Sequence, residues 1–177
     1  VDSLGGFGLL TAKPVLVLLN TADYCSPGEE AIDPTTRIHY PHQNAEVMAI
    51  QGKLEMEIAQ LDSEEAELFI EEFGIEEFSQ EKVIRTSYQL LGLQSFFTIN
   101  EDELRAWTVR KGATALDAAG TIHTDLARGF IRAEVIPYQT LVEAGSMAAA
   151  RKESKVRLEG KDYLVQDGDI IQIRFPI

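Results

Sequence analysis

Short runs of apolar residues separated by polar turns divide the chain into two regions with different patterns. In the first region, five apolar residues precede Asn20, and the run "EVMAI" follows an irregular loop at 24–45. Continuous apolar runs of this length are typical of buried parallel strands in an α/β sheet. Leu54, Ile58 and Leu61 then follow at helical spacing, which completes half of a βαβ layer.

Two further helices are predicted before residue 92. Asp62, with Glu65 in the capping-box position, is predicted to begin a helix that ends at Gly74. Ser79 is predicted to cap a second helix that ends at Gly92. The first helix has an apolar face lined by Leu68, Phe69 and Phe73. The second is expected to point Val83, Ile84, Tyr88 and Leu91 inward.

After residue 92 the pattern changes to short runs rich in β-branched and aromatic residues, which predict strands. These runs are "SFFTI", "ELRAWTVR", "FIRAEVI", "KVRL" and "DIIQIRF". One predicted helix, "ATALDAAGTIHTDLA", lies between the second and the third run. A small mixed sheet around one helix is a β-grasp, ubiquitin-like fold. The predicted domains are therefore 1–92 and 93–177.

The charge of the chain is concentrated in the first region. The 177 residues carry a net charge of −13. Residues 1–92 hold 5 Lys and Arg against 17 Asp and Glu, a net −12, whereas residues 93–177 hold 11 against 12, a net −1. An acidic surface repels a phosphate backbone, so only the second region is expected to contact RNA. The candidate residues are Arg151, Lys152 and Lys155, and the alternative is a mixed solvated surface.

Cysteine and membrane signals are sparse. The single Cys25 excludes an internal disulfide and favours a reducing, cytoplasmic compartment. The apolar run near the N-terminus is too short to span a membrane, so no membrane partner is expected. His39 and His42 lie near Cys25 in the loop, but surface positions are favoured over a metal site, and no metal is predicted.

Asn20 and Asp23 follow the first predicted strand, at the end of the sheet where ligands bind in α/β proteins. Many nucleotide-binding GTPases read a purine base with this spacing, although an Asn at a strand end also forms turns. His123, in "AAGTIHTD", is interpreted as a polar helix cap. Trp107 is interpreted as a packed strand residue rather than a base-stacking one.

The 177 residues contain no phosphate-binding loop, which would read G-x-x-x-x-G-K-S/T. The two Gly-Lys pairs, at 52–53 and 160–161, lack both the earlier Gly and the following Ser or Thr. Asp117–Gly120 matches a D-x-x-G metal motif but is interpreted as a small helix with a Gly stop. No nucleophile–base pair is found either, so no catalytic residue is predicted and this chain alone should not hydrolyse ATP or GTP.

Several long motifs resemble one family. The runs "RAWT", "AAGTIHTD", "GFIRAEV" and "LEGKDYLVQDGD" resemble the C-terminal TGS domain of the Obg-related, YchF-type ATPases. TGS is a β-grasp module shared with threonyl-tRNA synthetases and stringent-response enzymes. Upstream, "LLTAKPVLVLLN" and "IQGKLEMEIAQL" resemble the last strands and the final helix of the family's G domain, of the P-loop type. The resemblance covers nearly the whole chain and implies the C-terminal half of such a protein.

The resemblance also implies roles for particular residues. It assigns nucleotide-base binding to Asn20, Thr21, Asp23, Gln51 and Gly52. It implies no cofactor in this chain, ATP or GTP with Mg²⁺ in the intact parent, and nucleotide binding only together with the missing N-terminal half. It implies a ribosome or RNA partner for the TGS domain. A chain that begins with Val rather than Met fits a fragment.

Two departures from the family pattern bear on base preference. The family has N-x-x-E where this chain has Asn20 and Asp23, and S-A-K where it has Gln51-Gly52-Lys53. An Asp can accept from the N1 and N2 donors of guanine, so the choice between ATP and GTP stays open. The alternative function is a stand-alone β-grasp module that binds protein or RNA without a nucleotide.

Overall fold

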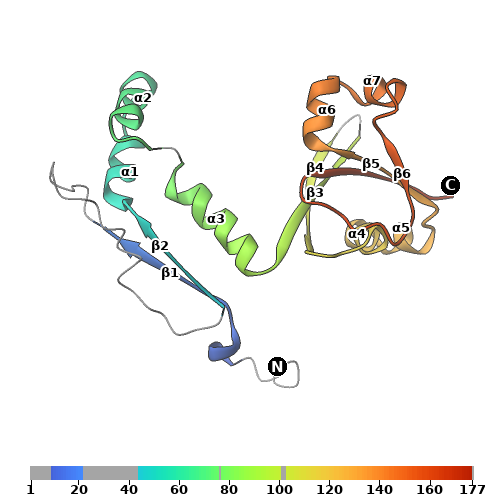
Figure 1. Ribbon diagram of the computed structural model, residues 1–177, viewed down its shortest axis with the longest axis horizontal. Helices are drawn as coiled ribbons and strands as arrows, with labels where there is room; N and C mark the ends of the chain where they lie inside the picture. Colours follow the sequence, from blue (N-terminus) through green and yellow to red (C-terminus); the bar gives the residue numbers. More distant parts are fainter. Residues whose placement is uncertain (1–8, 22–43, 76, 101–102, 177) are drawn as a thin grey trace. The chain divides into compact units, whose positions relative to one another are not determined.

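A computed structural model of the chain describes residues 9–21, 44–75, 77–100 and 103–176 (Figure 1). The chain divides into two compact units, Val1–Leu91 and Gly92–Ile177. This division places Gly92 at the start of the second unit, whereas the sequence pattern places the boundary directly after Gly92. None of the helices in the described part is both long and apolar enough to cross a membrane.

The described residues of the first unit form a short 3-10 helix (Leu10–Ala12), a two-stranded parallel sheet and three α-helices. Strands β1 (Val15–Asn20) and β2 (Ala45–Ile50) pair in register from Val15 opposite Ala45 to Asn20 opposite Ile50, as the apolar runs predict. Helix α1 (Gly52–Ile58) follows β2 directly. Helices α2 (Ser63–Glu72) and α3 (Ser79–Leu90) follow in turn.

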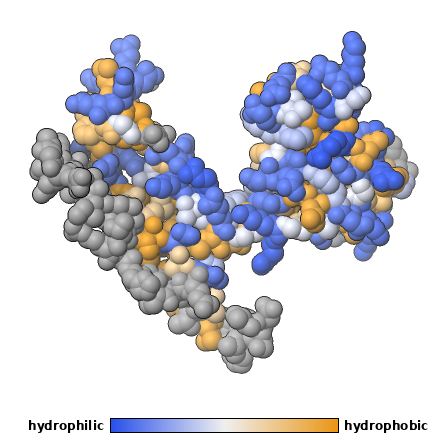
Figure 2. Space-filling view, in the orientation of Figure 1, coloured by the Kyte–Doolittle hydropathy of each residue, from blue (hydrophilic) through white to orange (hydrophobic). Residues whose placement is uncertain are grey.

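The apolar residues of the first unit are less buried than the sequence predicts. Among its described residues, the buried apolar side chains are Met48, Leu54 and Ile58. Leu18, in a strand expected to be buried, is 44% exposed. Apolar residues therefore reach the surface, as the space-filling view also shows (Figure 2). Two strands and three helices bury only a small core, which explains the difference.

Helix α2 begins as predicted but does not bury its apolar residues. The Asp62 carboxylate accepts a hydrogen bond from the backbone N–H of Glu65 at 3.0 Å, which confirms the cap. Leu68 is 67% exposed, and Phe69 and Phe73 stack on each other with their centroids 6.0 Å apart while both stay exposed. The apolar face that these residues line is therefore present but stays exposed in the described structure.

The start of helix α3 also differs from its prediction. Phe78, not Ser79, occupies the cap position, and Ser79 is the first helical residue. The backbone N–H of Ser79 donates to the Glu55 carboxylate at 2.9 Å, and its hydroxyl donates to the same carboxylate. Ser79 thus ties α3 to α1. Ile84 and Leu91, both expected to face inward, are exposed.

The second unit is built on a mixed five-stranded sheet, and all five predicted strands are present. They are β3 (Leu93–Ile99), β4 (Leu104–Arg110), β5 (Arg132–Pro137), β6 (Arg157–Glu159) and β7 (Asp169–Arg174). Their order across the sheet is β4-β3-β7-β5-β6. β3 and β7 are parallel, and the other pairs are antiparallel.

The predicted helix between β4 and β5 is two helices, α4 (Ala115–Ile122) and α5 (Thr124–Arg128). His123 lies between the two helices and separates them, because its backbone is extended. Its Nδ1 accepts a hydrogen bond from the backbone N–H of Asp125 at 3.2 Å. His123 is therefore a cap, as interpreted from the sequence. Gly120 lies inside α4 rather than at its end, so the predicted Gly stop is wrong.

Two further helices, α6 (Tyr138–Ala144) and α7 (Met147–Lys152), were not predicted. They are short, and Pro137 and Gly145 at their boundaries are typical of a loop in the sequence. Gly145 ends α6 with φ of +74°, a conformation that glycine adopts without strain. The two helices follow β5 on the side of the sheet opposite α4 and α5 (Figure 1).

The core of the second unit occupies both faces of the sheet. Strand β5 buries four consecutive residues, which is the pattern of a strand covered on both sides. Ala133 and Val135 pack with Phe96 and Ile171 in the cluster that includes α4. Ile136 packs in the second cluster, which includes residues of α6 and α7. Apolar core residues therefore cover much of both faces of the sheet.

Candidate functional site

The ends of β1 and β2 bring together two of the predicted base-binding residues. Asn20 is the last residue of β1, and its Oδ1 accepts a hydrogen bond from the backbone N–H of Gly52 at 3.2 Å. A Cβ on Gly52 would lie 3.3 Å from that oxygen, a tight contact that a small shift of the Asn20 side chain would have to relieve. The Asn20 amide group retains two N–H donors beyond this contact.

Thr21 and Gln51 complete the described part of this strand end. Thr21 donates twice to the carbonyl of Ile50, from its backbone N–H at 2.9 Å and from its hydroxyl at 3.1 Å. Thr21 therefore holds the turn after β1 against the end of β2. Gln51 is exposed before α1 and makes no cap hydrogen bond with its side chain. Asp23, the second predicted base-reading residue, lies outside the described residues.

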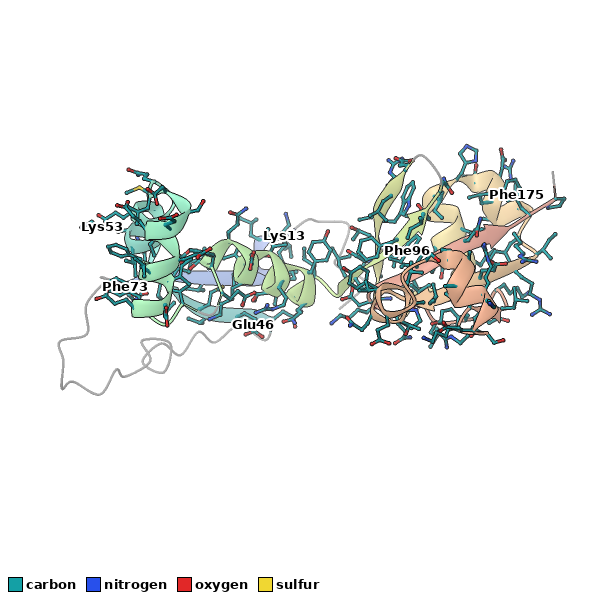
Figure 3. The ribbon with its side chains drawn as sticks, turned by 90° about the horizontal axis from the view of Figure 1, so that it is seen from above. Lys13, Glu46, Lys53, Phe73, Phe96 and Phe175 are labelled. Carbon is teal, nitrogen blue, oxygen red and sulfur yellow. The ribbon has the colours of Figure 1, made fainter. Side chains whose placement is uncertain are left out.

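Lys53 follows Gly52 but does not reach Asn20 in any observed contact. Its Nζ lies 3.8 Å from Oε1 of Glu57, one turn further along α1, and both side chains are largely exposed. Figure 3 shows Lys53 and Phe73 in the part of the unit formed by α1 and α2. This pair is an ordinary surface pair of the i, i+4 type.

The other positions singled out in the sequence form no metal site among the described residues. The described residues contain no group of three His, Cys, Asp or Glu side chains that could hold a metal ion. Cys25, His39 and His42 lie outside the described part. Asp117 caps α4: the hydrogen bonds from the Thr114 backbone and hydroxyl, both at 2.8 Å, lower the pKa of its carboxyl.

The three cations predicted to contact RNA are not equivalent. Arg151 donates to Oε2 of Glu134 from Nε at 3.2 Å and from Nη2 at 2.8 Å. Lys155 forms an ion pair with Glu153 at 2.8 Å, and Lys152 is exposed at the end of α7. Arg151 therefore has a structural partner, which the sequence pattern did not indicate.

Glu134 is the centre of a polar cluster on the sheet. Its side chain is 5% exposed, and Arg151 and Arg174 donate to different carboxylate oxygens. Burial alone would raise the pKa of the Glu134 carboxyl. The hydrogen bonds and charges of the two arginines have the larger combined effect, so this pKa lies below its ordinary value. Arg151 also donates to Oε1 of Gln172 at 2.8 Å.

Sequence reasoning missed Glu134 and Arg174, although a signal was present. Arg132 and Glu134 alternate with the buried Ala133 and Val135 along β5, and Gln172 and Arg174 alternate in the same way along β7. Period-two alternation places these polar side chains on one face. The strand register, which pairs β5 with β7, could not be read from the sequence.

A second buried acid, Asp169, has a structural role. It is 2% exposed, and its Oδ2 accepts hydrogen bonds from the Tyr163 hydroxyl at 2.8 Å and from the N–H of Gln166 at 2.9 Å. Burial, and then the contact with Asp169, raises the pKa of the Tyr163 hydroxyl. These groups fix the turn that leads into β7.

Comparisons with known proteins agree with this architecture. Residues 93–176 match the family model YchF-GTPase_C, described as a protein of unknown function (DUF933). The chain is 46% identical over 176 residues to the ribosome-binding ATPase YchF of Bacillus subtilis (strain 168), a match that covers 96% of this chain and 47% of that protein. It is 38% identical over 180 residues to Obg-like ATPase 1 of Gallus gallus, covering 99% of this chain and 45% of the relative.

A solved structure extends the match to three dimensions. The YchF GTPase of Schizosaccharomyces pombe matches with a TM-score of 0.76 and 29% identity, covering 98% of this chain and 46% of that one. The chain is thus an α/β protein, with a mixed sheet and helices, of the kind found in YchF GTPase structures. It spans about half the length of the curated relatives that it matches. The chain belongs to the YchF family and corresponds to the C-terminal half of its members.

Proposed function

We propose that this chain is the C-terminal portion of a nucleotide-dependent, ribosome-associated regulator. In this proposal, residues 1–92 form the end of a P-loop-type G domain, and residues 93–177 form a TGS domain that contacts the ribosome. The similarity over nearly the whole chain to proteins named as ribosome-binding ATPases carries the proposal. A ribosome partner would place its action in the cytoplasm.

The strand order of the second unit supports a β-grasp fold for the proposed TGS domain. In order along the chain, its five strands lie 2-1-5-3-4 across the sheet. The first and last strands are parallel neighbours in the interior, and α4 follows the first hairpin. This is the strand order of ubiquitin-like folds. Helices α6 and α7 are an addition between the third and fourth strands.

The contact between Asn20 and Gly52 supports a role for the first unit in reading the nucleotide base. A residue after β1 and a residue after β2 meet at the carboxyl ends of a parallel sheet, which is where α/β proteins bind ligands. In the intact parent, ATP or GTP with Mg²⁺ would be held mainly by the phosphate loop, and Asn20 would add base selectivity. Charge-assisted contacts to phosphates are the strong ones, so this chain alone should bind nucleotide weakly.

Co-sedimentation with ribosomes tests the proposal on the chain as it exists. We expect the 177-residue chain to pellet with ribosomes at low salt and to be released as salt rises, because contacts to phosphates are weakened by competing counterions. The chain centrifuged without ribosomes is the control. A chain that stays in the supernatant at low salt, with ribosomes in excess, would contradict ribosome association through this half of the protein.

A further inference from the structure

The open part of the second unit's sheet carries a cluster of three arginines, and one buried acid holds two of them. Arg132, Glu134, Gln172 and Arg174 lie on the same face, because Arg132 pairs with Arg174 and Glu134 pairs with Gln172 in the β5–β7 register. Arg151 reaches this face from α7. The opposite side of the same strands faces the apolar cluster that includes α4.

The charges on this face do not balance. Arg132 and Arg174 stand directly opposite each other on neighbouring strands, and like charges in that position destabilise a sheet. Glu134 is the acid that pairs with Arg174 and Arg151, and no ion pair of Arg132 is found among the described residues. Three guanidinium groups against one carboxylate leave an excess of two positive charges, which an anion would relieve.

The arginines are oriented but still accessible. Each carboxylate oxygen of Glu134 accepts from a different guanidinium group, and this fixes both groups without using all their N–H donors. The side chains of Arg151 and Arg174 remain 48% and 58% exposed. Planar guanidinium groups with free donors are suited to bidentate contacts with phosphate oxygens.

The shape of this face favours an extended ligand. Small molecules bind in concave sites that enclose them, whereas these arginines lie on an exposed strand surface. Leu158, opposite Glu134 on β6, is 60% exposed and adds an apolar contact beside the cations. A chain of phosphates that also carries flat aromatic bases matches this combination.

We propose that Arg132, Arg151 and Arg174 form a binding site for the phosphodiester backbone of RNA, with Glu134 as a positioning residue. The proposal rests on the proposed ribosome contact of this unit and names the residues that make it. It replaces Lys152 and Lys155 at the centre of the site by Arg132 and Arg174. The lysines then flank the site at and beyond the end of α7.

Arg132 is the residue of choice for the test, because no hydrogen bond or ion pair of its side chain is found in the described part. The full chain with Arg132→Gln should keep its fold. The matched control is Arg128→Gln, which removes the same charge from α5. The Arg128 side chain is 82% exposed, and its ion pair with Asp125 is long at 3.7 Å. Arg132→Lys keeps the charge but loses the fork of donors.

The probe is a fluorescein-labelled oligouridine about 20 nucleotides long, and its anisotropy is measured over a salt series. Arg132→Gln should weaken binding several-fold at low salt and lower the slope of log affinity against log salt by about one. Arg132→Lys should keep that slope with reduced affinity. Arg128→Gln should match the unmodified chain. Equal losses in Arg132→Gln and Arg128→Gln, or no loss in either, would overturn the site.

The same variants in ribosome co-sedimentation separate this proposal from the one it rests on. If the unmodified chain does not pellet, ribosome association fails. If it pellets and Arg132→Gln pellets equally well, ribosome association stands and the arginine site is overturned. If oligouridine does not bind but Arg132→Gln still reduces pelleting, the partner at this face is a protein and the RNA proposal is overturned.

Discussion

At the scale of single residues, the structure separates positions that hold the fold from positions open to a partner. Asn20 and Gly52 are predictable, because a polar residue after a buried strand marks the ligand end of a parallel sheet. The contacts of Glu134 with its arginines are not predictable in this way. They depend on the pairing of β5 with β7 and on α7, which the sequence pattern did not reveal.

Glu134→Gln tests the buried carboxylate at the centre of the arginine cluster. At neutral pH the variant should lower the free energy of unfolding by about 1–3 kcal/mol, because it removes the charge that two guanidinium groups share. Trp107, the one Trp in the sequence, packs against the core of this unit, so its fluorescence reports the unfolding. Glu159→Gln, in a surface pair with Arg157, is the control and should cost under about 1 kcal/mol.

The pH dependence of this loss has a defined sign. The pKa of Glu134 is below its ordinary 4.5 in the folded chain, so the carboxylate stabilises fully above pH 4.5 and less as the pH falls through the lower, folded value. The stability difference between the unmodified chain and Glu134→Gln should therefore shrink in that acid range. A difference independent of pH would contradict a charged Glu134.

At the scale of elements, strand prediction succeeded more completely than helix prediction. The five strands of the second unit have alternating or continuous apolar runs that are long enough to read. Helices α6 and α7 are short and bounded by turn residues, so their local signal is that of a loop. In the first unit the helices exist as predicted and α1 buries Leu54 and Ile58, but Leu68 of α2 and Ile84 of α3 stay exposed. The burial of a helix face depends on neighbours that local pattern cannot supply.

Thr114→Ala tests the element that the sheet of the second unit packs against. Thr114 and Asp117 form a capping box at the start of α4, with reciprocal hydrogen bonds. Losing the side-chain cap should lower the free energy of unfolding by about 1 kcal/mol. Thermal unfolding followed by Trp107 fluorescence measures the change, and Thr114→Ser, which retains the hydroxyl, is the control. A loss as large in Thr114→Ser would point to the Thr methyl group instead of the cap.

At the scale of the whole molecule, the two units differ in charge and in burial. The first region is strongly acidic and its described residues bury few apolar side chains, whereas the second is near neutral and has core clusters on both faces of its sheet. The chain also spans about half of its curated relatives. These observations support the central proposal, that the second unit folds independently and is the part of this half that contacts the ribosome.

The most direct test is to express residues 1–92 and 93–177 separately and to centrifuge each with ribosomes at low salt. We expect 93–177 to fold alone, with cooperative loss of Trp107 fluorescence on heating, and to pellet with ribosomes. Residues 1–92 should stay in the supernatant, because a net charge of −12 repels RNA. Pelleting of 1–92 together with a folded 93–177 that stays in solution would contradict the account.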